Sequence, residues 1–408
     1  MSNIEKLIKE LCPDGVEYKE LKSVFEMRNG YTPSKAKAEF WEGGTIPWFR
    51  MEDIRENGNI LSDSAQHITP AAVKGKLFPA NSIIVATSAT IGEHALITVE
   101  SLANQRFTYL VRRPEYEEKL DPKFVYYYCY KLDEWCLNNT NISSFPSVDM
   151  AKFAKFKIPI PPLPIQREIV RVLDNFTELT AELTAELTAR KKQYEYYRDT
   201  LLTFGVHRGG TFETKWRTLA EIADIGTGSS NTNEAVEDGK YPFFVRSQEP
   251  LRKNDYEYDE TAIITAGDGV GVGKVYHYVE GKYALHQRAY RIHIVAPDVL
   301  PRFFFYYMKA KFLPYIQKNV FQGSVSSIRR PMLNAFPVPV PDVELQERIV
   351  NVLDNFDAIC SDLNIGLPAE IEARKKQYEY YRDMLLTFAA ADDIILTDRQ
   401  TDRQTEPN

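Results

Sequence analysis

Two polar tripeptides, Asn104-Gln105-Arg106 and His286-Gln287-Arg288, end in the same Gln-Arg pair, one in each half of the chain. Amide and guanidinium groups on loops can hydrogen-bond base edges and backbone phosphates in DNA. Residues that both halves share cannot distinguish two different base sequences. The shared pair therefore suits phosphate positioning or a scaffold role, and polar residues that differ between the halves suit base reading.

Other polar residues on loops extend this set of candidate DNA contacts. In the first half the candidates are Thr32, Ser34, Lys35, Lys37, Arg50, Ser88, Thr90, Asn104, Gln105, Arg106, Ser143 and Ser144. In the second half they are Ser229, Ser230, Asn231, Arg246, Ser247, Gln248, Asp268, His286, Gln287, Arg288, Gln322, Ser324, Ser326, Ser327, Arg329 and Arg330. For any single residue, the role of an ordinary loop or capping residue is at least as probable as a DNA contact, so the hypothesis rests on the whole set.

Segments that resemble catalytic or phosphate-binding motifs lack the residues that those motifs require. The segment "GDGVGVGK" (267–274) is not a phosphate-binding P-loop, because Asp268 stands where glycine is needed and Val275 where serine or threonine is needed. An acidic set of Asp199, Glu213 and Lys215 has a spacing loose enough to arise by chance. The scattered histidines form no metal-ligand pattern. We therefore expect no catalytic residues, no metal and no cofactor in this chain.

The elements that position these loops come from an internal repeat. "IQREIVRVLDNF" (165–176) returns as "LQERIVNVLDNF" (345–356), and "RKKQYEYYRD" (190–199) returns at 374–383. The segments upstream of each copy also correspond, with much more divergence. The chain is thus one unit used twice, a divergent globular part followed by a nearly constant helix.

Local patterns predict an α/β (α+β) fold. Apolar runs at 82–89 and 261–269 predict strands, and the aromatic runs around Tyr127 and Tyr306 predict a helix packed on each sheet. Alternating prolines at 159–164 and 337–341 predict extended lead-ins to the long helices.

The long helices carry a 4-3 apolar seam that continues through the tetrads "TAEL" at 180–183 and 184–187. The second helix is expected to break at Gly366 and restart at Pro368. Because each seam must be covered, we expect the two helices to form an antiparallel coiled coil with pseudo-two-fold symmetry.

These patterns predict five segments. They are a globular domain (1–157), a spacer helix (158–209), a second globular domain (210–337), a distal spacer helix (338–388) and a disordered tail (389–408). A charged helical stretch is usually a solvated face, but the recurrence of the basic, tyrosine-rich run favours partner docking. The docking candidates are Arg190, Lys191, Lys192, Tyr196, Arg374, Lys375, Lys376 and Tyr380.

Composition sets limits on these readings. The net charge of −7 argues against DNA binding only as an average, because phosphate contacts need a local basic face. No apolar run is long enough for a membrane-spanning helix, and the first residues lack a signal-peptide core. Four cysteines without paired spacing predict reduced thiols. We expect a cytoplasmic protein.

The proline-led blocks, the tetrads and the paired "RKKQYEYYRD" segments together resemble the specificity (S) subunit of type I restriction-modification enzymes, of the TAEL-repeat (type IC-like) subgroup. The resemblance covers residues 10–388. It implies two target recognition domains that each read one half of a split, asymmetric DNA sequence, with helices that set the gap and dock two methylation subunits.

Restriction-translocase subunits would attach through those partners, and S-adenosylmethionine, ATP and Mg²⁺ would bind to the partners. The resemblance thus implies a non-catalytic chain within an endonuclease and adenine-methyltransferase complex. One alternative is a coiled-coil scaffold whose globular halves bind proteins. Another is a free-standing nuclease or methyltransferase, which would need activity in the purified chain alone.

Overall fold

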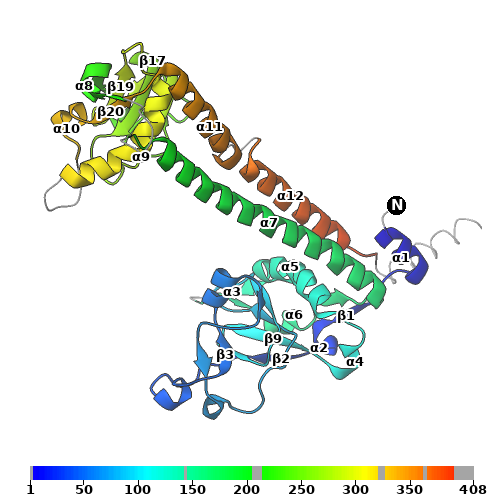
Figure 1. Ribbon diagram of the computed structural model, residues 1–408. Coiled ribbons are helices and arrows are strands. Elements are labelled where there is room, and N and C mark those ends of the chain that lie inside the picture. Colours follow the sequence, from blue (N-terminus) through cyan, green and yellow to red (C-terminus); the bar gives the residue numbers. More distant parts are fainter. Residues whose placement is uncertain (1–2, 142–144, 205–213, 320–326, 362–364, 390–408) are drawn as a thin grey trace, which may run out of the picture. The chain divides into compact units, whose positions relative to one another are not determined.

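The computed structural model describes residues 3–141, 145–204, 214–319, 327–361 and 365–389 (Figure 1). The chain divides into two compact units. The first unit comprises residues 1–181 and 373–408, and the second comprises residues 182–372. Helix α7 (Leu163–Leu201) and helix α12 (Leu367–Leu385) contribute residues to both units. None of the helices in the described ranges is both long enough and apolar enough to cross a membrane.

The first unit is built on a five-stranded sheet of order β2-β9-β6-β7-β4. Its strands are β2 (Phe25–Asn29), β4 (Ile60–Leu61), β6 (Ser82–Ala86), β7 (His94–Ile97) and β9 (Phe107–Arg112). A second, three-stranded sheet contains β3 (Ile46–Phe49), β5 (His67–Ile68) and β8 (Leu102–Ala103). Two two-stranded pairs add β1 (Tyr18–Glu20) with β12 (Lys157–Pro159) and β10 (Thr140–Asn141) with β11 (Ser147–Val148).

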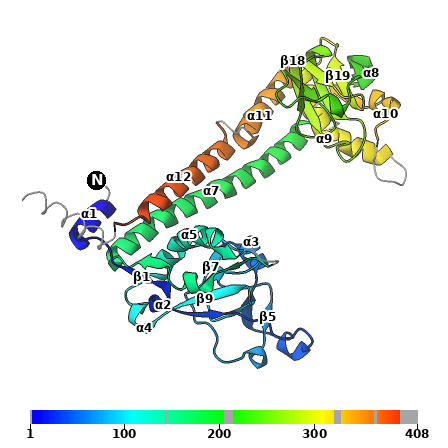
Figure 2. The ribbon, with the colours of Figure 1, turned by 180° about the vertical axis from the view of Figure 1, so that it is seen from behind.

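Helix α5 (Pro122–Asn138) lies along one face of this sheet, against β6 and β7 (Figures 1 and 2). The Asp121 side chain caps its first turn by accepting from the Lys123 amide, and Pro122 occupies the first helical position. The smaller helices are α1 (Asn3–Leu11), α2 (Leu21–Val24), α3 (Met51–Asn57), α4 (Pro114–Glu117) and α6 (Met150–Phe153), with 3₁₀ turns η1 (Ala38–Phe40) and η2 (Pro70–Ala72).

The second unit repeats this plan with a six-stranded sheet of order β14-β19-β17-β18-β15-β16. Its strands are β14 (Ala223–Thr227), β15 (Tyr241–Phe244), β16 (Leu251–Lys253), β17 (Tyr258–Ala266), β18 (Tyr276–Leu285) and β19 (Ala289–Ile294). A separate two-stranded sheet pairs β13 (Lys215–Thr218), which precedes these strands in the chain, with β20 (Pro337–Val340), which follows them. The short elements are α8 (Leu219–Ile222), η3 (Thr232–Glu234) and α10 (Arg330–Asn334).

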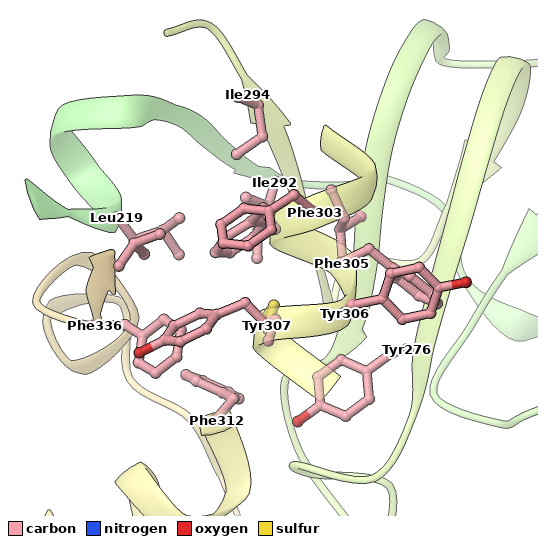
Figure 3. Packing of buried hydrophobic residues seen from close by; sticks show 14 of the residues in the cluster. Leu219, Tyr276, Ile292, Ile294, Phe303, Phe305, Tyr306, Tyr307, Phe312 and Phe336 are labelled. Atoms are coloured by element: carbon pink, nitrogen blue, oxygen red, sulfur yellow. The ribbon is translucent and has the colours of Figure 1, made fainter. Parts of the chain in front are cut away.

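Helix α9 (Pro301–Asn319) covers the second sheet, in contact with β17 and β18, and supplies eight of the buried residues of the core there. Figure 3 shows its aromatic side chains, including Phe303, Tyr307 and Phe312, meeting Ile292 of β19 and Phe336. These residues are all 5% exposed or less, so the helix is held by a continuous apolar contact with the sheet. The predicted strands at 82–89 and 261–269 are confirmed as β6 and β17, although these end earlier, at Ala86 and Ala266, and the predicted helices around Tyr127 and Tyr306 are confirmed as α5 and α9.

The long helices pair in each unit by aromatic contacts. In the first unit Phe176 of α7 stacks on Tyr381 of α12, with ring centroids 5.4 Å apart. In the second unit Tyr197 of α7 stacks on Phe356 of α11 (Val343–Ser361), at 5.7 Å. Early residues of α7 thus meet late residues of α12, and late residues of α7 meet α11, which confirms the antiparallel pairing. The expected break is also present, since α11 ends at Ser361 and α12 begins at Leu367, next to Pro368.

Candidate nucleic-acid interface

In the second unit, loops that follow four different strands join in one hydrogen-bonded network. The His286 amide donates to the Phe244 carbonyl at 2.9 Å, which ties the end of β18 to the end of β15. The Gln287 amide donates to the Ser230 carbonyl at 3.0 Å, which adds the loop after β14. The Gly267 amide donates to the Arg288 carbonyl at 2.9 Å, which adds the loop after β17. Residues remote in sequence thereby share one surface.

The segment before α10 completes this network. The Ile328 amide donates to the Gly267 carbonyl at 2.8 Å, and Asp268 pairs with Ser327 as an isolated β-bridge. Buried groups within the network are satisfied by neighbours: His286, 5% exposed, accepts at Nδ1 from the Arg288 amide at 3.0 Å. Burial lowers the pKa of His286, and the positive charges of Arg246 and Arg288 lower it further against the opposing effect of Asp268.

The first unit builds the same network from different side chains. The Asn104 amide donates to the Phe49 carbonyl at 3.0 Å, the Thr87 amide to the Arg106 carbonyl at 3.0 Å and the Val148 amide to the Thr87 carbonyl at 2.9 Å. Each bond has its counterpart in the second unit. These bonds make Asn104 equivalent to His286, Arg106 equivalent to Arg288, and Ser88 equivalent to Asp268.

One glycine in each unit permits the close approach of two of these loops. A Cβ on Gly30 would lie 2.2 Å from the Ala103 carbonyl oxygen, and one on Gly228 would lie 1.8 Å from the Leu285 carbonyl oxygen. Either distance is far inside van der Waals contact, so a side chain would push the loops apart. The two glycines occupy equivalent places, directly after β2 and β14.

The most strongly charged part of the network is a carboxylate between two guanidinium groups. Arg246 Nη1 lies 2.7 Å from Asp268 Oδ1, and Arg288 Nη1 lies 3.2 Å from Asp268 Oδ2. Burial by itself raises the pKa of the Asp268 carboxyl. The hydrogen bond and charge of Arg246 and the charge of Arg288 outweigh that effect, so the pKa lies below its ordinary value.

The structure brings together many of the predicted DNA-contact residues. In the first unit the Thr32 hydroxyl donates to Gln105 Oε1 at 2.6 Å, and Arg50 directly follows β3 beside this contact network. In the second unit Gln287 donates to the Asn231 side chain, and the Ser229 amide donates to Glu257 Oε2 at 2.9 Å. Ser230 is only 2% exposed, so it supports the loop rather than presenting its hydroxyl.

Other predicted DNA contacts lie away from the backbone network or outside the residues that the structure describes. Ser34, Lys35 and Lys37 are exposed on the segment before η1, where Lys37 Nζ lies 3.6 Å from Glu39. Arg330 donates through Nη2 to the Ile225 carbonyl of β14, which makes it part of the scaffold. Thr90, Ser247, Gln248 and Arg329 sit next to network residues without joining the backbone bonds above. Ser143, Ser144, Gln322, Ser324 and Ser326 lie outside the described residues.

Two apolar residues beside the networks are not among the predicted DNA contacts. Val270 is 96% exposed and follows Gly269, which has φ +79°. Phe145 is 78% exposed and precedes the strand that pairs with Ser88. Ala89, equivalent in place to Gly269, also has a positive φ of 66°. The signal available in the sequence was an apolar side chain inside a turn rich in glycine or serine.

The predicted docking segments have the same local geometry in the two units. Tyr196 is 67% exposed and packs edge-on against Tyr197 at 5.5 Å, while Tyr380 is 65% exposed and packs edge-on against Tyr381 at 5.5 Å. Arg190 donates to Gln193 at 3.2 Å, and Arg374 donates to Gln377 at 3.0 Å. The side chains of Lys191, Lys192, Lys375 and Lys376 are exposed. Both tyrosines thus point away from the helix seam.

Among the residues the structure describes, no group of three or more His, Cys, Asp or Glu side chains is placed to hold a metal ion.

Comparisons with known proteins agree with this doubled architecture. The family model described as "Type I restriction modification DNA specificity domain" matches residues 13–190 and again residues 213–373. The chain is 44% identical over 386 residues to the type I restriction enzyme EcoprrI specificity subunit of Escherichia coli, covering 89% of this chain and 92% of the relative. It is 34% identical over 303 residues to the EcoR124I/EcoR124II specificity subunit of Escherichia coli, covering 65% of this chain and 70% of the relative.

Two solved structures share the fold. A chain from a structural study of complex assembly and conformational transition of the type I R-M system aligns with a TM-score of 0.63 at 18% identity, covering 91% of this chain and 97% of that one. The type I restriction-modification S subunit from M. genitalium aligns with a TM-score of 0.53 at 16% identity, covering 91% and 95%. The α/β expectation with two globular domains and long helices is confirmed by these neighbours.

Proposed function

The chain belongs to the type I restriction modification DNA specificity family, and from this premise we propose that it is the DNA sequence-specificity subunit of a type I restriction-modification complex. Each unit would read one half of a split, asymmetric target. The observation that carries the proposal is the network of polar loops, which is built twice on the same backbone bonds but with different side chains. A common scaffold with divergent polar surfaces suits two readers of unlike sequences.

We divide the chain accordingly into recognition domains at 1–157 and 210–337, and helical spacers at 158–209 and 338–388, with a tail at 389–408. The helices would set the gap between the half-sites. The exposed basic and tyrosine-rich runs at 190–199 and 374–383 would dock two methylation subunits, because the two runs repeat both in sequence and in local contacts.

Catalysis would belong to the partners in this scheme. The methylation subunits would bring S-adenosylmethionine and modify adenine, and restriction-translocase subunits would bring ATP and Mg²⁺. This chain would contribute the choice of sequence and the geometry of the assembly. The complex would act in the cytoplasm, on duplex DNA. The Gln105-Arg106 and Gln287-Arg288 pairs suit phosphate positioning in both halves, since the same two residue types occupy this place in each unit.

The test is an exchange of residues 1–155 for the corresponding part of a relative, followed by methylome sequencing of a host that expresses the chain with its methylation subunits. The expected result is a change in one half of the methylated sequence and retention of the other half. A simultaneous change in both halves would show that the units do not read independently. Methylation or duplex binding without sequence preference in the unexchanged complex would favour a coiled-coil scaffold with protein-binding halves.

A further inference from the structure

The second unit contains a charged set with no counterpart in the first. Asp268 accepts from Arg246 at 2.7 Å and from Arg288 at 3.2 Å, one arginine on each carboxylate oxygen. All three side chains reach solvent: 41% of Arg246, 26% of Asp268 and 60% of Arg288 is exposed. In the first unit, the residue equivalent to Asp268 is Ser88, which has no charge to hold a guanidinium group.

The charge balance makes this arrangement unusual for a surface that faces DNA. A carboxylate close to phosphates is electrostatically repelled, so phosphate contact alone would favour the two arginines without the acid. An acid retained between two arginines instead restricts their conformations. A guanidinium group that uses one Nη on a carboxylate keeps its other N–H groups, in a planar fork, for a second partner.

The backbone around the set is fixed on both sides, so the restriction is real. Asp268 lies between the Gly267 amide, bonded to the Arg288 carbonyl at 2.9 Å, and its own bridge to Ser327. The turn wraps closely around Arg246: a Cβ on Gly271 would lie 2.5 Å from the Arg246 carbonyl oxygen. His277 Nε2 lies 3.1 Å from the carbonyl oxygen of Ser247, which fixes the residue after Arg246.

The two arginines differ in what they can contribute. Arg288 has the equivalent Arg106 in the first unit, and a residue common to both units does not separate their targets. Asp268 corresponds to Ser88, and Arg246, two residues after Phe244, corresponds to Met51, two residues after Phe49, so both belong to the second unit alone. The commonest specific contact of arginine with DNA is bidentate pairing with O6 and N7 of guanine in the major groove. A fork aimed by a carboxylate on a rigid turn meets the geometric demand of that contact.

We propose that Arg246 reads a guanine in the half-site recognised by the second unit, and that Asp268 is the positioning residue that aims it, with Arg288 holding Asp268 from the other side. This inference rests on the proposed function and names the chemistry of one of its two readers. It requires a G·C pair in that half-site. Lysine at 246 would keep the charge but lose the fork, so the effect on specificity should exceed the effect on overall affinity.

The experiment uses the full chain assembled with its methylation subunits, and selects binders from a duplex library with randomised positions. The variants are Arg246→Lys, Asp268→Asn and, as the matched control, Arg252→Lys. Arg252 donates to the backbone carbonyls of Gly239 and Lys240 and is outside the network. In Arg246→Lys, preference for guanine at one position should fall on the order of 10- to 100-fold, with the other half-site unchanged. Asp268→Asn should reduce the preference for guanine at the same position. Arg252→Lys should select the same sequences as the unaltered protein.

A second measurement alters the DNA. Each guanine of the selected half-site is replaced in turn by 7-deazaguanine, which lacks the N7 acceptor. One such replacement should weaken binding of the unaltered complex by about tenfold or more, and should have little further effect on Arg246→Lys. The inference is overturned by a half-site without a G·C pair, by tolerance of 7-deazaguanine at every position, or by Arg246→Lys keeping full discrimination. Failure of the unaltered complex to enrich any sequence would instead overturn the proposed function.

Discussion

The Tyr127 hydroxyl donates a hydrogen bond to Asp174 Oδ1 over 2.7 Å, and this contact joins the sheet-covering helix α5 to the long helix α7 in the first unit. The second unit repeats it between Tyr306 of α9 and Asp354 of α11, at 2.5 Å. A cation completes each contact: Lys123 Nζ lies 2.7 Å from Asp174, and Arg302 Nε lies 2.8 Å from Asp354. The aspartate of each "LDNF" block thus fixes a globular part to its own helix.

Removal of that tether should loosen the first unit. Burial raises the pKa of the Tyr127 phenol, as does its hydrogen bond to Asp174, so the hydroxyl stays a donor at neutral pH. Tyr127→Phe should lower the free energy of unfolding by about 0.5–1.5 kcal/mol, measured by denaturant titration of the complex. Tyr256→Phe is the control, since the Tyr256 side chain is 43% exposed and lies outside the docking runs. Equal stability of the two variants would show that the tether contributes nothing.

A fully buried glutamine at the start of each long helix should be more critical. Gln166 accepts from the Asp121 amide at 2.8 Å and donates to the carbonyls of Lys119 at 2.8 Å and Pro161 at 2.6 Å. Gln166→Leu removes the hydrogen-bond partner of these three backbone groups, which should lower the free energy of unfolding by about 2–4 kcal/mol. Hydrogen exchange should then rise around residues 119–121 and 161.

The second unit supplies the matched control for that substitution. Gln346 bonds in the same way to Leu300, Asp298 and Pro341, at 2.9, 2.8 and 2.7 Å. Gln346→Leu should raise exchange around residues 298–300 and 341 and leave residues 119–121 unchanged. Protection that persisted after either substitution would show that water or a neighbouring side chain replaces the glutamine.

Two consecutive arginines at the start of α10 should separate a DNA contact from a scaffold contact. Both residues are exposed, but Arg329 precedes the helix, whereas Arg330 donates through its guanidinium to the Ile225 carbonyl. Arg329→Ala should weaken binding and reduce the slope of log affinity against log salt by about one unit, if it neutralises one phosphate. Arg330→Ala should mainly lower the free energy of unfolding, by about 1 kcal/mol. A reduced salt slope in Arg330→Ala and a loss of stability in Arg329→Ala would show that Arg330 contacts DNA and that Arg329 belongs to the scaffold.

The TAEL tetrads should act as the ruler for the gap. Leu183 and Leu187 are half-buried within α7, and a third tetrad would keep leucine in the same seam. Four added residues give roughly 6 Å of rise and about 40° of net rotation. One base pair gives roughly 35°, and a recognition domain must face its groove, so rotation should decide. We expect the gap to lengthen by one base pair with both half-sites unchanged.

The measurement for the tetrad insertion is methylation of a series of targets with every gap length. A preference that stayed at the original gap would show that α7 does not set the spacing. A change in the half-site sequences themselves would show that the insertion disturbs the recognition loops. The present two-tetrad chain, assayed on the same series, is the control.

Periodicity and repetition in the sequence determined the elements of this protein. The 4-3 spacing around Ile165 and Ile169 predicted the long helix, because side chains three and four residues apart share one helical face. The prediction was incomplete near the start of α7, where Val170 and Leu173 are also buried. That segment packs within the globular core as well as against α12, so it buries two faces, and a single seam could describe only one.

Only the tertiary structure decided which polar loops act together. Repetition in the sequence paired Gln105 with Gln287, since both motifs have the same length and the same last two residues. It could not pair Ser88 with Asp268, because the turns around them differ in composition and share no residue that reveals the match. Their equivalence follows from the residues just before them, since the Thr87 amide donates to the Arg106 carbonyl and the Gly267 amide donates to the Arg288 carbonyl across neighbouring strands. Contacts between strands depend on sheet register, which is set by packing across the whole core and is not encoded in any local segment.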